Sequence, residues 1–197
     1  MKIFTVRHGQ THWNTLGRIQ GHTDMPLDEA GLAQAEKLGV RLAGEKVDII
    51  YSSDLARAAK TAEIINLYHD AEFVSTPALR EIGFGIYEGH FYMEVADEIK
   101  RHHNLKQPVP GGESVNDYYD RIRGFLDEIT AKHHRNIIIV SHHGTIRAAI
   151  CYFLQIPIED RDRFYIDNTA IHCFERGDDG KFCMTLENDV SHLDYMF

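Results

Sequence analysis

Short hydrophobic strands alternate with amphipathic helices along this chain, and glycines and prolines stand where one element changes to the next. In chain order the predicted elements are a strand at 2–6, a helix at 28–41, a strand at 47–51, a helix at 52–65, a strand at 72–75, a helix at 115–129, a strand at 136–140, a helix at 145–154 and a hairpin of 170–175 with 181–187. This alternation predicts a three-layer α/β/α sandwich with a mostly parallel central sheet. The stretch 77–112 is predicted to be mostly loop, with some helix near 94–103.

Two of the predicted strands end in a similar way. Arg7-His8-Gly9 follows the first strand, and His142-His143-Gly144 follows the strand at 136–140. In open α/β sheets the ligand binds beyond the carboxyl ends of the strands. We therefore expect His8 and His142 to share one site.

The residues around the first histidine suit phosphoryl transfer, which needs a nucleophile and positive charge on the non-bridging oxygens. A neutral His8 could supply the nucleophile. Arg7 and Arg57 could hold the phosphate through charge-assisted hydrogen bonds. Their charge also disfavours protonation of His8, which keeps its nitrogen free near neutral pH.

Three further groups complete the predicted chemistry. His142 could donate a hydrogen bond to the phosphoryl group, and the backbone N–H groups of His143 and Gly144, which open a helix, favour an anion. Glu81 is the best candidate for the acid that protonates the leaving oxygen and for the base that activates water. Each residue alone has an ordinary explanation as a turn, loop or surface residue, so the prediction depends on their combination.

Composition restricts the class of protein. The 197 residues are predicted to form one domain, 1–197, with a net charge of −9 that disfavours nonspecific nucleic-acid binding. No apolar run approaches the ~20 residues needed to span a bilayer, so no membrane partner is expected. The three cysteines lack metal-ligand spacing, which indicates a reduced, cytoplasmic protein. The sequence does not predict an oligomeric state.

Several short motifs follow one another along the chain. They are Arg7-His8-Gly9-Gln10-Thr11 with Trp13-Asn14, Gly17-Arg18-Ile19-Gln20-Gly21, Tyr51-Ser52-Ser53-Asp54-Leu55-Ala56-Arg57-Ala58, Leu79-Arg80-Glu81-Ile82, Gly111-Gly112-Glu113-Ser114 and Val140-Ser141-His142. Together they resemble the histidine phosphatase superfamily, also called phosphoglycerate mutase-like, over almost the whole chain.

The resemblance implies a role for each matching residue. His8 would be the phosphorylated nucleophile, Glu81 the proton donor, and Arg7, Arg57 and His142 the phosphate pocket. Asn14 would also contact phosphate, and Gln20 and Gly21 would line the substrate site. No metal or cofactor is implied. His143 stands where the family commonly has glycine, so its ring could narrow the pocket or add a third imidazole.

Within this resemblance we expect a phosphatase that acts on small phosphorylated metabolites. A cofactor-dependent phosphoglycerate mutase, primed by bisphosphoglycerate, is the alternative, but its longer basic insertion has no counterpart in the compact stretch 91–110. A non-catalytic phosphate-binding protein is a third reading, although all the core residues are present. A metal-dependent hydrolase is disfavoured because the usual histidine ligand spacings are absent. Residues 83–112 are predicted to determine substrate specificity.

Overall fold

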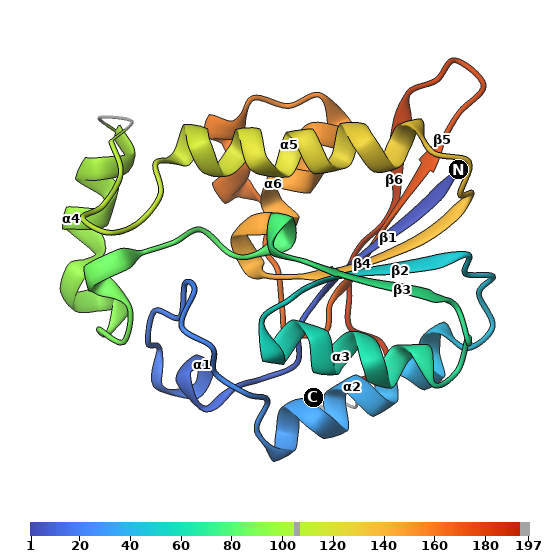
Figure 1. Ribbon diagram of the computed structural model, residues 1–197, viewed down its shortest axis with the longest axis horizontal. Coiled ribbons are helices and arrows are strands. Elements are labelled where there is room, and N and C mark those ends of the chain that lie inside the picture. Colours follow the sequence, from blue (N-terminus) through green and yellow to red (C-terminus); the bar gives the residue numbers. More distant parts are fainter. Residues whose placement is uncertain (105–106, 194–197) are drawn as a thin grey trace.

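Six strands form one sheet among residues 1–104 and 107–193, the part of the chain that the computed structural model describes (Figure 1). The strands are β1 (Lys2–Arg7), β2 (Ile49–Ser53), β3 (Glu72–Thr76), β4 (Asn136–Ser141), β5 (Ile171–Arg176) and β6 (Phe182–Asp189). Their spatial order is β3-β2-β4-β1-β5-β6. β1 to β4 are mutually parallel and β5 is antiparallel to both of its neighbours, which confirms the mostly parallel sheet.

Helices cover both faces of this sheet (Figure 1). The helices α2 (Glu29–Leu42) and α3 (Ala56–Asn66) lie on one face, and α5 (Val115–Ala131) and α6 (His143–Leu154) lie on the other. Successive residues of β4 point to opposite faces, so Ile137 and Ile139 join the core with α5 and α6, while Ile138 and Val140 join the core with α2 and α3. The predicted three-layer sandwich is confirmed.

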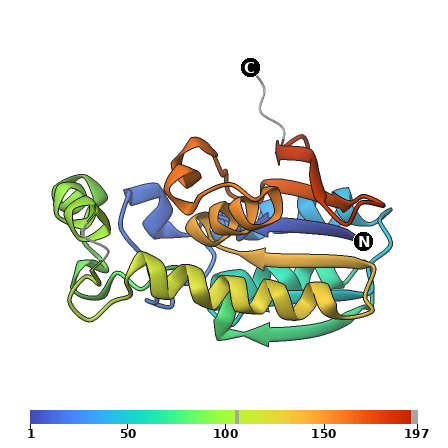
Figure 2. The ribbon, with the colours of Figure 1, turned by 90° about the horizontal axis from the view of Figure 1, so that it is seen from above.

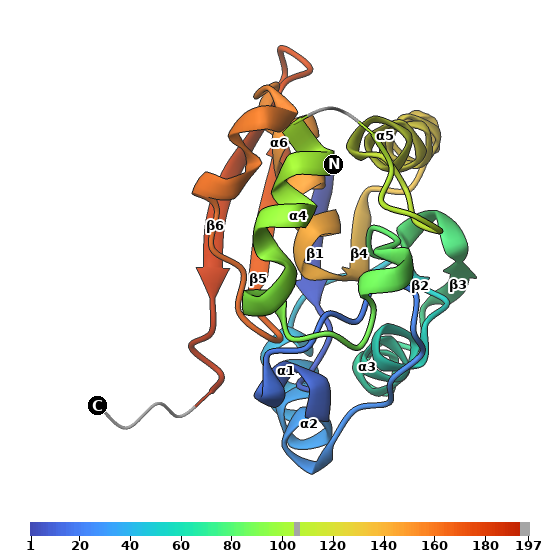
Figure 3. The same ribbon diagram turned by 90° about the vertical axis from the view of Figure 1, so that its left-hand side faces the viewer.

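The parallel strands bring the two histidines to one edge of the sheet. β1 pairs with β4 so that Arg7 lies opposite Ser141, and His8 and His142 come next in their chains. In two perpendicular views α4 (Tyr92–Asn104) lies beyond this end of the sheet (Figures 1 and 2). Figure 3 looks onto the same end and shows α4 in front of the strands, with α1 (His12–Leu16) below it.

The segment around α4 has its own small apolar cluster. It consists of Ile19, Tyr87, Val95, Ile99 and Val109, all buried. The partly buried Phe84 packs against this cluster and also against the main core beside α5 and α6. The predicted helix near 94–103 is therefore α4, which is slightly longer and packs on residues from distant parts of the chain.

The elements β2, α3 and α1 differ from the sequence prediction. β2 continues through Ser53 and α3 begins only at Ala56, because the Ser53 side chain accepts a hydrogen bond from the Leu55 N–H group (3.3 Å) and turns the chain first. The short helix α1 was not predicted, since five residues carry too little periodicity. Its start is stabilised by reciprocal hydrogen bonds between Thr11 and Asn14.

Short 3₁₀ turns complete the connections at Pro77–Leu79 (η1), Gly85–Tyr87 (η2) and Ile158–Arg163 (η3). Ser114 begins α5 by accepting a hydrogen bond from the Asp117 N–H group. None of the helices in the described part of the chain is long and apolar enough to cross a membrane.

Candidate active site

The rings of His8 and His142 lie side by side at the sheet edge, with their centroids 5.2 Å apart. Both are buried, with 3% and 1% of their surface exposed. The Nδ1 atom of His8 lies 2.7 Å from the carbonyl oxygen of Gly9. Because a carbonyl oxygen can only accept, Nδ1 carries the hydrogen and Nε2 keeps a free lone pair.

Arg57 organises the second histidine. This buried residue donates from Nε to His142 Nδ1 (3.2 Å), from Nη1 to the Thr23 carbonyl (2.9 Å) and from Nη2 to the Gly21 carbonyl (2.8 Å). Since His142 accepts at Nδ1, its hydrogen lies on Nε2. That Nε2 atom is buried and has no partner among the described residues. It is therefore a donor available to a bound anion.

Arg7 supplies a second buried cation at the end of β1. Its Nη1 donates to the Ile166 carbonyl (2.7 Å), and its buried Nε has no partner in the described part of the chain. Burial lowers the pKa of Arg7 and of Arg57 to about 10, so both remain charged at neutral pH. Burial, followed by the charges of Arg57 and Arg7, holds the pKa of His8 well below its usual value. His8 is therefore a neutral imidazole.

Glu81 reaches the same site from the loop after η1. Its Oε2 accepts from the Gly144 N–H group (2.9 Å) at the start of α6, and its Oε1 accepts from the Ile82 N–H group (3.0 Å) and the Tyr118 hydroxyl (3.2 Å). The sequence predicted that the helix start would favour a substrate anion. In this structure the Gly144 N–H group donates to Glu81 instead. The start of a helix is a favourable place for a carboxylate.

A second layer of side chains holds the Glu81 loop in position. Arg121 on α5 donates to the carbonyls of Ala78 (2.9 Å), Arg80 (3.1 Å) and Glu81 (3.3 Å). The sequence singled out neither Tyr118 nor Arg121. Their helix positions carry no local signal of a contact with this loop.

All the residues predicted to form the site line one cavity of about 760 Å³. They are Arg7, His8, Asn14, Gln20, Gly21, Arg57, Glu81, His142 and His143. Asn14 uses its Oδ1 atom to cap α1, and the buried Gln20 Oε1 atom has no described partner. Gly21 has a φ of +51°, and a Cβ atom there would collide with the Glu88 carboxylate.

His143 is a neutral third imidazole in this cavity. Burial, with smaller contributions from Arg7 and Arg147, lowers its pKa to about 3. The cavity also includes Trp13 and Arg18 from the sequence motifs, and Tyr92, Lys100 and His103 from the stretch 83–112. The lining residues that the sequence did not indicate include Arg147, Arg161, Asp162 and Tyr165.

A family comparison agrees with this geometry. The model of the histidine phosphatase superfamily (branch 1) matches residues 3–189. The chain belongs to the histidine phosphatase superfamily. The resemblance and the enzyme class predicted from the sequence are thereby confirmed.

Named members of the superfamily are similar over most of the chain. Phosphoglycerate mutase-like protein 4 of Arabidopsis thaliana is 36% identical, covering 98% of this chain and 87% of its own. The metal-independent phosphoserine phosphatase of the same plant is 33% identical, covering 98% and 83%. The crystal structure of phosphoserine phosphatase from Entamoeba histolytica in complex with 3-phosphoglyceric acid superposes with a TM-score of 0.84, at 31% identity and 98% coverage of each chain.

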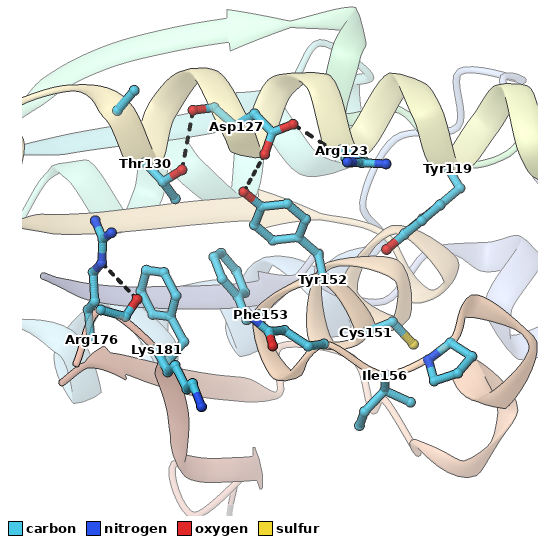
Figure 4. Close-up of a pocket in the computed structure, with 15 residues that line it drawn as sticks. Tyr119, Arg123, Asp127, Thr130, Cys151, Tyr152, Phe153, Ile156, Arg176 and Lys181 are labelled. Atoms are coloured by element: carbon cyan, nitrogen blue, oxygen red, sulfur yellow. Dashed lines mark hydrogen bonds and ion pairs between the residues drawn. The ribbon is translucent and has the colours of Figure 1, made fainter.

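A second hollow lies between α5, α6 and the β5–β6 hairpin (Figure 4). Its polar groups bind one another: the Tyr152 hydroxyl donates to Asp127 (2.7 Å), which also pairs with Arg123 (3.8 Å). Burial raises the pKa of the Cys151 thiol to about 11, so it is not a thiolate. None of the described residues lining it is a histidine. This hollow therefore lacks the groups found in the histidine phosphatase site.

Among residues 1–104 and 107–193, no cluster of three or more His, Cys, Asp or Glu side chains is arranged to hold a metal ion. Beside His8 the histidine phosphatase site holds the buried positive charges of Arg7 and Arg57.

Proposed function

We propose that this protein is a phosphomonoesterase that hydrolyses small phosphorylated metabolites through a phosphohistidine on His8, without a metal. One observation supports this more than any other. A neutral histidine with a free Nε2 lone pair lines a cavity with two buried arginines and with the unpartnered Nε2 atom of His142.

In the first step Arg7 and Arg57 bind the phosphoryl oxygens, and His142 donates a hydrogen bond from Nε2. The lone pair of His8 Nε2 attacks phosphorus and forms a P–N bond. The bond between phosphorus and the leaving oxygen breaks, and protonated Glu81 gives its proton to that oxygen. The products are an alcohol, the phosphohistidine and the Glu81 carboxylate.

In the second step the Glu81 carboxylate removes a proton from water, and the water oxygen attacks phosphorus. The P–N bond breaks, its electron pair returns to His8 Nε2, and inorganic phosphate leaves. Glu81 is again protonated and His8 is again neutral. Both steps need only groups that line the cavity.

The proposal of metal independence has two supports. Arg7 and Arg57 already provide charge on the side where the phosphoryl oxygens would lie, and they would repel a divalent cation beside His8. One relative with 98% coverage of this chain is named as a metal-independent phosphoserine phosphatase. The cytoplasmic location and the specificity role of 83–112, of which 105–106 lie outside the described residues, stay predictions.

The test is an incubation in EDTA with 3-phosphoglycerate, O-phosphoserine and α-ribazole phosphate, in which inorganic phosphate and product identity are measured together. We expect phosphate release from at least one compound, at a rate that EDTA does not lower. Inhibition by EDTA that a divalent cation reverses would contradict metal independence. Conversion of 3-phosphoglycerate to 2-phosphoglycerate without phosphate release, after priming with bisphosphoglycerate, would indicate a mutase. Binding without turnover would indicate a non-catalytic member.

The acid role of Glu81 predicts a dependence on the leaving group. In Glu81→Gln we expect kcat/KM to fall about 10²-fold or more for an alkyl phosphate, and clearly less for p-nitrophenyl phosphate, whose leaving group needs little protonation. The parameter kcat/KM is chosen because it includes only the steps up to departure of the leaving group. Equal losses for both substrates would exclude this role.

A further inference from the structure

The cavity is strongly cationic although the chain carries a net charge of −9. Of its described lining residues six are Lys or Arg and two are Asp or Glu. A phosphate dianion between Arg7 and Arg57 would neutralise two of these cations. Arg18, Lys100, Arg147 and Arg161 remain, opposed only by the acidic side chains of Glu81 and Asp162. The part of the cavity that receives the leaving group therefore keeps an excess of positive charge.

Arg147 differs from the other three in how firmly it is held. Its Nε donates to the Phe164 carbonyl (2.7 Å) and its Nη1 to Asp162 Oδ1 (2.9 Å). The side chain is only 17% exposed, whereas the Asp162 side chain is 74% exposed. A guanidinium group fixed at two nitrogens has lost most of its freedom before any ligand arrives, so binding to it costs little further entropy.

The remaining nitrogen of Arg147 is free to bind. Among the described residues Nη2 has no hydrogen-bond partner, while burial lowers the pKa of the group. Arg18, by contrast, stacks on the Phe91 ring at 4.1 Å and donates to the Gly89 carbonyl. The hydrogen bonds of Nε and Nη1 connect α6 to η3, but they do not explain why Arg147 also lines the cavity.

The position of Arg147 sets the size of the group that could reach it. Arg147 follows His143 by four residues on α6, which is about 6 Å along a helix axis. Its charge contributes to lowering the pKa of both Arg7 and His143, so it acts within the same cavity. A short leaving group bound in this cavity could therefore contact Arg147 while its phosphate lies beside Arg7 and Arg57.

We propose that Arg147 binds a carboxylate at the far end of the leaving group, and that it thereby selects phosphate esters of short hydroxy acids. This inference rests on the proposed function of the cavity. Asp162 and the Phe164 carbonyl are positioning groups that aim the guanidinium group. The carboxylate adds a charge-assisted hydrogen bond that a neutral analogue cannot form.

The test compares substrates that differ only in this carboxylate. They are 3-phosphoglycerate against glycerol 3-phosphate, and O-phosphoserine against O-phosphoethanolamine. In the natural protein we expect kcat/KM to be at least about 10-fold higher for the carboxylate of each pair. In Arg147→Met we expect kcat/KM for the substrates with a carboxylate to fall about 10- to 100-fold. For the two substrates without a carboxylate we expect kcat/KM to change less than about 3-fold.

The two substrates without a carboxylate also report whether Arg147→Met still folds, because their turnover needs the intact phosphate pocket. Arg163→Met is the matched control: it removes a positive charge from the neighbouring 3₁₀ turn η3, which also carries Asp162, but Arg163 does not line the cavity. It should preserve the preference for carboxylates. Equal losses on both members of each pair in Arg147→Met, or no preference in the natural protein, would overturn the inference.

Calorimetric titration separates this inference from the proposed function. If 3-phosphoglycerate binds more tightly than glycerol 3-phosphate and Arg147→Met removes the difference, the carboxylate contact stands even where no phosphate is released. Phosphate release from all four compounds without preference would leave the phosphatase proposal intact and would exclude the role of Arg147.

Discussion

His8→Ala is expected to lower kcat/KM by at least about 10³-fold and to abolish labelling of the protein by a ³²P-phosphorylated substrate. The reason is that His8 Nε2 carries a free lone pair beside the groups of Arg7, Arg57 and His142 that can donate hydrogen bonds to an anion. The arginines and His142 remain in the variant. It should therefore still bind phosphate, and the loss should appear in turnover rather than in affinity.

His143→Ala is the matched comparison, because it removes another neutral imidazole from the same cavity. It should keep the ³²P label on the protein. Although His8 is buried, its Nδ1 atom bonds only to its own neighbour Gly9, so we expect His8→Ala to unfold at nearly the natural temperature. A labelled His8→Ala protein would show that the nucleophile lies elsewhere.

Arg57→Lys is expected to damage both activity and stability, although it conserves the charge. Arg57 donates hydrogen bonds to His142, Thr23 and Gly21 from three nitrogens of one planar group. A single ammonium group cannot reproduce that geometry. At least one buried acceptor would lose its partner, at a cost of roughly 1–3 kcal/mol in the free energy of unfolding.

The loss of activity should be larger than this stability change implies. Without the Nε donor His142 is free to change tautomer, and the phosphoryl oxygens lose one arm of their binding site, so we expect kcat/KM to fall about 10²-fold or more. Urea unfolding and steady-state kinetics measure the two effects. Arg123→Lys, at an exposed residue on α5, is the control and should change neither. Full activity in Arg57→Lys would contradict the proposed phosphate pocket.

Much of this arrangement follows from local sequence patterns. Alternating strands and helices predict a mostly parallel sheet, which places the carboxyl ends of β1 and β4 at one edge. The structure adds that the two strands are neighbours, so that the rings of His8 and His142 meet. The motif residues Arg57 and Glu81 then join them in one cavity.

Other parts of the site depend on contacts between distant segments and leave no local pattern. Tyr118 and Arg121 occupy ordinary helical positions, yet they hold the Glu81 loop. The engagement of the Gly144 N–H group by Glu81 could not be predicted either, because a helix start favours any nearby anion equally. In the sequence Arg147 has the pattern of an ordinary surface charge. Only the structure shows that η3 folds back over α6 and contacts this side chain.

The separate apolar cluster beneath α4 has a consequence for how such enzymes diverge. Ile99 and Phe84 line the cavity. Ile99 packs with Val95 and Val109 in this cluster, and Phe84 connects the cluster to the main core. The phosphate-binding groups stand on the sheet and on α3 and α6. During evolution α4 and its apolar cluster could therefore be replaced, with a change of substrate, while the residues that bind phosphate stay unchanged.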